Sequence, residues 1–198
     1  IWNNFSLIFP ATIVLIAGYI IERERTDDTL KNLATIPVSF RRLLVGKIIV
    51  CGMITIFLAI AEFLFTTIIS FILGYGELTL FIMIKALWQM IGMNCFVFIA
   101  VLPIIIFTGQ RAGAFMPGVA FAFFYGFIGT FASGHGLTSL YPITIGLGFI
   151  NYQNGNDTGI YNLPLCFTVL LILVVIIVIM LFLAHDRAKI QKVKRGTA

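Results

Sequence analysis

Long apolar runs, separated by short polar stretches, set the pattern of this sequence. A helix rises about 1.5 Å per residue, so about 20 apolar residues cross the hydrocarbon core of a bilayer. Strands of a membrane barrel would alternate between apolar and polar residues, and these runs do not alternate. The pattern predicts an all-α membrane protein with five spanning helices, over Phe5–Ile21, Ile48–Leu73, Leu80–Phe107, Gly113–Phe131 and Leu163–Ala184.

The composition supports this class of protein. The 198-residue chain is 60% hydrophobic and only 11% charged, with a mean hydropathy of +1.07. A soluble domain of this size has no core that could hold so much apolar surface. The cysteines Cys51, Cys95 and Cys166 lie inside apolar runs without the spacing of a metal site, so we interpret them as packing residues. We expect residues 1–198 to form one membrane domain.

The main polar interruption, Glu22–Lys47, holds ten of the charged residues of the chain. Its first half predicts a short amphipathic helix over 26–36, with a polar capping residue at its start. Leu30 and Leu33 share one face of this helix, and Pro37 ends it. We therefore expect a helix that lies on the membrane surface and is accessible to a water-soluble partner.

The second half of the same segment leads into the next predicted span. Ser39 can cap a helix that begins at Phe40. Arg41, Arg42 and Lys47 are then expected at the depth of lipid phosphates.

Basic residues indicate the orientation in the membrane. If the Glu22–Lys47 segment is cytoplasmic, the turn at Arg111 and the tail after Ala184 are cytoplasmic too. Twelve of the thirteen Lys and Arg residues then lie inside, and only Lys85 lies near the outer side. The carboxyl terminus is therefore expected in the cytoplasm. The amino end falls outside without a signal peptide, so we expect a further membrane helix before it, giving six in the full protein.

The outer segment 132–162 contains no basic residue. Its middle, Leu140–Ile150, is apolar but only eleven residues long, too short to span a bilayer. A pair of re-entrant or interfacial helices would bury this surface, whereas a flexible loop would leave it in water. We expect such short helices before the last span.

Two polar residues stand near the middle of predicted spans. Glu62 lies roughly 22 Å along its helix from Lys47, and Asn94 lies roughly 20 Å from the inner end of the following antiparallel helix. The two side chains can therefore meet. A carboxylate at this depth is costly unless it is paired or lines a wet cavity. The pair either lies on a translocation path or fixes the packing of two helices.

Catalytic motifs give no support for an enzyme. The sequence has no GxxxxGK[ST] phosphate-binding loop. Ser133-Gly134-His135 matches one piece of a lipid-phosphatase site, but the second histidine, His185, is expected on the opposite side of the membrane. The basic tail follows a span and lacks interleaved aromatic residues, so it favours lipid contact and not nucleic acid. We expect a protein without catalytic residues, metal or bound cofactor.

The charged segment and its flanks resemble the permease of a type-2 ABC transporter, an exporter family for drugs, bacteriocins, lipids and polysaccharides. The resemblance rests on the order of four short motifs between two spans. They are Glu22-Arg-Glu-Arg, Thr29-Leu30, Ile36-Pro37-Val38-Ser39 and Gly46-Lys47.

The resemblance implies a six-helix subunit that pairs with a second permease copy, in a homodimer or a related heterodimer, in a bacterial cell membrane. Two ATPase subunits, which carry ATP and Mg, would dock on a coupling helix over 26–36. The coupling residues it implies are Glu22, Glu24, Thr26, Asp27, Asp28, Thr29, Leu30 and Leu33. The expected function is export of an amphiphilic substrate, as in the bacteriocin-immunity and peptide-antibiotic-resistance subgroup. The alternative is a membrane protein without an ATPase, either an ion-driven carrier or an anchoring or sensor subunit.

Overall fold

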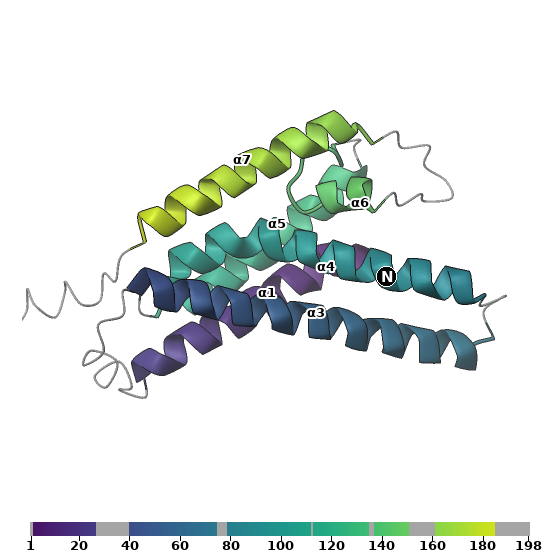
Figure 1. Ribbon diagram of the computed structural model, residues 1–198, viewed down its shortest axis with the longest axis horizontal. Coiled ribbons are helices and arrows are strands. Elements are labelled where there is room, and N and C mark those ends of the chain that lie inside the picture. The colour runs from purple at the N-terminus through teal and green to yellow at the C-terminus, as the bar shows by residue number, and fades with distance from the viewer. Residues whose placement is uncertain are drawn as a thin grey trace, which may run out of the picture.

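The computed structural model describes residues 2–26, 40–74, 79–111, 113–134, 137–150 and 161–184, with side chains from residue 7 onward and without those of 24–26 and 133–134. The regular secondary structure of these residues is helical, and turns connect the helices (Figure 1). The helices are α1 (Trp2–Thr26), α3 (Phe40–Ile72), α4 (Leu80–Gly109), α5 (Phe115–Gly134), α6 (Ile145–Phe149) and α7 (Leu163–Phe182).

The prediction of an all-α membrane protein is confirmed, with four helices long and apolar enough to cross a bilayer. These are α3, α4, α5 and α7, and each contains a predicted span apart from at most two residues at its ends. The first predicted span falls inside α1, so its helical structure is confirmed, while its crossing of the membrane stays a prediction. The predicted helix start at Phe40 is also confirmed, because α3 runs unbroken from this residue into the span.

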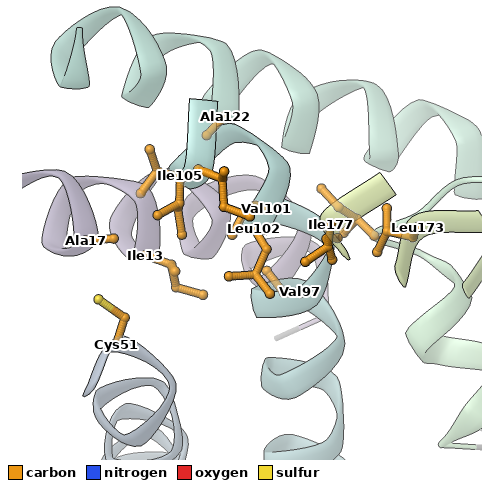
Figure 2. Packing of buried hydrophobic residues seen from close by; sticks show 14 of the residues in the cluster. Ile13, Ala17, Cys51, Val97, Val101, Leu102, Ile105, Ala122, Leu173 and Ile177 are labelled. Carbon is orange, nitrogen blue, oxygen red and sulfur yellow. The ribbon is translucent and has the colours of Figure 1, made fainter. Parts of the chain in front are cut away.

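Helix α4 is the centre of the bundle and contacts each of the other described helices. It contributes eleven buried residues, more than α3 or α7, because its neighbours surround it on several sides. Figure 2 shows Val97, Val101 and Ile105 of α4 in the core, near Ile13 and Ala17 of α1. Residues of α5 and α7 close the same cluster, so packing on α4 fixes how the spans are arranged.

The last turns of α3, beyond Ala59, and the first turns of α4, before Met90, extend beyond the rest of the bundle at the right of Figure 1. We call them the outer parts of α3 and α4. No residue of α3 is buried beyond Ala59, and no residue of α4 is buried before Met90. Large apolar side chains on these parts, such as Phe65, Phe71 and Phe81, are exposed. In a membrane, this surface is available to lipid or to another subunit.

The outer segment differs from its prediction. A single short helix, α6, replaces the expected pair in residues 137–150, and its residues Ile145 to Gly148 are buried. Two glycines allow α6 to pack closely against α4 and the start of α7. A Cβ on Gly146 would lie 2.9 Å from Met93 Sδ, and a Cβ on Gly148 would lie 3.2 Å from Cys166 Sγ. The residues of α6 are thus covered by α4 and α7, while Leu137 and Leu140 stay exposed.

Tyr141 ties this outer segment to α5. Its hydroxyl donates a hydrogen bond to the carbonyl oxygen of Tyr125 at 2.6 Å. Its ring packs on Gly129, where an added Cβ would lie only 3.1 Å from the ring. Burial raises the pKa of Tyr141 to about 12, so the hydroxyl stays protonated and keeps donating at physiological pH.

Close contact of α1 and α5 gives a test of this packing. A Cβ on Gly18 would lie 2.7 Å from Phe115 Cβ, whereas a Cβ on Gly46 would meet nothing within 4 Å. We expect Gly18→Ala to lower the free energy of unfolding by about 1–3 kcal/mol through overpacking. Gly46→Ala, the matched control, should leave it unchanged or raise it slightly, because alanine favours helix. Thermal unfolding in detergent measures both, and equal stability of the two variants would contradict the packing.

Candidate functional site: the polar end of the bundle

One end of the bundle brings together the polar groups that flank the undescribed segment 27–39. Helix α1 ends at Thr26 and α3 begins at Phe40, next to the α4–α5 turn and the end of α7, at the left of Figure 1. We call this set the polar end and define it by Glu22, Arg41, Lys47, Gly113 and the carbonyl groups of Ile21 and Ala184. Each side of the segment is attached here to other helices.

Glu22 attaches the last turns of α1 to the α4–α5 turn. Its Oε1 accepts a hydrogen bond from the backbone N–H of Gly113 at 2.8 Å. Gly113 has φ = 72°, a backbone conformation that glycine adopts without strain and that other residues rarely adopt. A carboxylate is a strong acceptor for such an N–H group. The turn between α4 and α5 is therefore held by the helix that enters segment 27–39.

Lys47 attaches α3 to α1. Its side chain is only 8% exposed, and its Nζ donates a hydrogen bond to the carbonyl oxygen of Ile21 at 3.3 Å. This location corrects the prediction that Lys47 faces lipid phosphates. A cation is favourable near the carboxyl end of α1, where the helix dipole is negative, and a carbonyl oxygen has a second lone pair that can accept from Lys47.

Arg41 attaches the start of α3 to the end of α7. Its Nε donates a hydrogen bond to the carbonyl oxygen of Ala184 at 3.4 Å. Among the described residues, the polar end thus joins α1 to α3, α1 to the α4–α5 turn, and α3 to α7. Both sides of segment 27–39 are therefore in direct contact with these helices.

The predicted coupling residues are described only in part. Glu22 is placed at the polar end, while Glu24 and Thr26 belong to the last turn of α1, without described side chains. The other predicted coupling residues lie outside the described residues; these are Asp27, Asp28, Thr29, Leu30 and Leu33. The coupling helix therefore stays a prediction.

Sequence reasoning missed the roles of Lys47 and Gly113. A lysine one turn inside a long apolar run was a signal for an internal acceptor, because such a position is costly without a partner. A glycine in a very short connection between two spans was a signal for a left-handed backbone.

The predicted meeting of Glu62 and Asn94 is confirmed. The carboxyl group of Glu62 in α3 makes a hydrogen-bond contact with the side chain of Asn94 in α4. Asn94 has 0% of its surface exposed, and its Nδ2 also donates to the carbonyl oxygen of Met90 at 3.1 Å. The two residues form a second polar site, inside the spans.

This arrangement defines a helical membrane component whose polar groups join helices to one another. A family model described as "ABC-2 family transporter protein" matches residues 1–129, which include α1, α3, α4 and most of α5. The chain therefore belongs to the ABC-2 family of transporter membrane proteins. Members of this family are normally non-catalytic permease components that work with an ATPase. No curated protein and no solved structure matches the chain significantly.

The contact of Glu22 with Gly113 can be tested by hydrogen exchange. Glu22→Ala removes the acceptor, so we expect the Gly113 amide to exchange about tenfold faster, as the loss of one charge-assisted hydrogen bond implies. Glu22→Gln keeps a side-chain oxygen and should show a smaller increase. Mass spectrometry of peptides that cover residues 107–118 measures the exchange, and equal rates in the wild type and Glu22→Ala would rule out the attachment.

Proposed function

We propose that this chain is the permease subunit of an ATP-driven exporter, in which a partner ATPase acts on segment 27–39. The observation that carries the proposal is the match to the ABC-2 family over residues 1–129. The polar end supports it, because both sides of the segment are joined there to other helices. ATP and Mg belong to the ATPase in this scheme, and the permease itself supplies no catalytic group.

The mechanism is mechanical. Movement of the ATPase shifts segment 27–39 and with it the end of α1 and the start of α3. Glu22 passes this shift to the α4–α5 turn, and Arg41 passes it to α7. Because α1 and α5 pack closely over much of their length, the shift changes their tilt together.

Orientation and assembly follow from charge and surface. Arg41, Arg42 and Lys47 begin α3, which favours a cytoplasmic location of the polar end by the excess of basic residues on that side. The exposed apolar faces of α3 and α7 suit a second permease copy as well as lipid. The proposed substrate is an amphiphile, either a peptide, bacteriocin, drug or lipid, because it has to leave or cross the hydrocarbon layer.

Purification of the native complex separates an exporter from a carrier or anchoring subunit. A mild detergent extract of cells that express the tagged chain should yield an ATPase in about equal amount with the chain. Reproducible purification without any ATPase would contradict the proposed function.

A substitution in the predicted coupling helix gives a sharper test. We expect Leu30→Asp to lower ATP-driven export at least about tenfold, because it places a charge on the docking face. The chain should still insert in the membrane, and Leu30→Met, the matched control, should keep export within about twofold. Vesicle transport measured with ATP hydrolysis checks both variants, and coupled export by Leu30→Asp would exclude this docking face.

A further inference from the structure

The Glu62–Asn94 contact lies deep within two long helices. Along α3, Glu62 is about 22 Å from Lys47, and along α4, Asn94 is about 22 Å from Gly109. Glu62 is the only acidic residue of α3, α4, α5 and α7. A carboxyl group at such a position is rare and is retained where it has a partner or a function.

The contact leaves two buried oxygen atoms without a donor. Neither Glu62 Oε2 nor Asn94 Oδ1 has a hydrogen-bond partner among the described residues. A buried acceptor left in this state costs about 1–3 kcal/mol. The site therefore lacks donor hydrogens for these two oxygens among the described residues.

The basic residues of these two helices lie too far away to supply them. Lys47 is about 22 Å along α3 and already donates to Ile21, and Arg41 lies further still. Lys85 is about 14 Å from Asn94 along α4, towards the opposite end. A donor that also carries positive charge would satisfy both oxygens and neutralise the Glu62 carboxylate.

The site lies at the edge of the buried core. The buried face of α3 ends at Ala59, one turn before Glu62, and Glu62 itself is partly exposed. Its neighbours Ala61 and Phe65 are exposed on the outer part of α3. The two oxygens themselves are buried, so a head group that arrives from the hydrocarbon layer, or from the interface between two copies, reaches them only if the side chains of Glu62 and Asn94 shift.

We propose that Glu62 and Asn94 bind the protonated amino group of an amphiphilic substrate. This inference rests on the proposed function and adds a substrate class to it. Glu62 supplies the negative charge and one acceptor, and Asn94 supplies a neutral acceptor held by its own bond to Met90. An ammonium group has up to three N–H donors, so it can satisfy both free oxygens at once.

The competing role is helix packing alone. A proton on Glu62 Oε2 can bridge to Asn94 Oδ1, which would satisfy both atoms without any ligand. A packing pair of this kind would not distinguish an amine from a neutral amphiphile of the same length. The experiment below separates the two roles by this difference.

The test is carbodiimide labelling of the intact complex in lipid nanodiscs. Dicyclohexylcarbodiimide modifies protonated carboxyl groups in apolar surroundings, and mass spectrometry quantifies the unmodified Glu62 that remains, so that an amide formed between activated Glu62 and an added amine counts as labelling. We expect dodecylamine, cationic at neutral pH, to reduce labelling about tenfold, which corresponds to about 1.4 kcal/mol of binding preference. N-dodecylacetamide, which is neutral, should give no protection. Equal labelling with both compounds, or no labelling without them, overturns the inference.

Transport of the same amine provides the second measurement. Glu62→Gln should reduce ATP-driven uptake of dodecylamine into inside-out vesicles about tenfold, because the charge is lost. Thr67→Val is the matched control on α3: the Thr67 hydroxyl already bonds the carbonyl oxygen of Phe63, so uptake should not change. Unchanged uptake by Glu62→Gln counts against the site.

The two proposals fail in different ways. If no ATPase accompanies the chain, the exporter is excluded, while the labelling result still reports on Glu62 because it needs no ATP. If an ATPase is present and neutral amphiphiles are exported, but dodecylamine gives no protection, only the amine site is excluded.

Discussion

Buried polar groups need partners within the protein, and this requirement applies to Lys47 at the polar end and to Glu62 and Asn94 in the middle of the bundle. At the polar end, the buried ammonium group of Lys47 donates to the carbonyl group of Ile21 in another helix. The backbone N–H of Gly113 is likewise satisfied by Glu22. In the middle, Glu62 and Asn94 satisfy each other only in part. The complete pairs fix helices to one another, whereas the incomplete pair leaves two acceptors without a donor among the described residues.

This division links structure to transport. An ABC-2 permease has no bond to make or break, so its task is to convert a push on one segment into a change of helix arrangement. In the proposed mechanism, the hydrogen bonds of the polar end transmit that push to α1, α3, α7 and the α4–α5 turn. Helix α4 packs against every other described helix, so a movement of one helix displaces the others. The outer parts of α3 and α4 have no buried residues, so their side chains can contact lipid or a second subunit without breaking contacts in the core.

Much of this arrangement could be predicted from the sequence, because lipid imposes a simple rule on length and polarity. The spans, the start of α3 at Phe40 and the meeting of Glu62 with Asn94 all follow from that rule and from the rise of a helix. The burial of Lys47 did not follow, because its acceptor on Ile21 belongs to another helix. The single helix α6 did not follow either, since the contacts of Gly146 and Gly148 with α4 and α7 depend on tertiary packing.

The most direct test of the mechanical role of the polar end is the number of molecules exported per ATP hydrolysed in a Lys47→Met permease. Methionine keeps much of the side-chain volume but cannot donate to Ile21. If the contact transmits the push, hydrolysis stays within about twofold of the wild type while export falls about tenfold, so the ratio drops. An unchanged ratio, with normal insertion and ATPase binding, would show that movement reaches the spans without this contact.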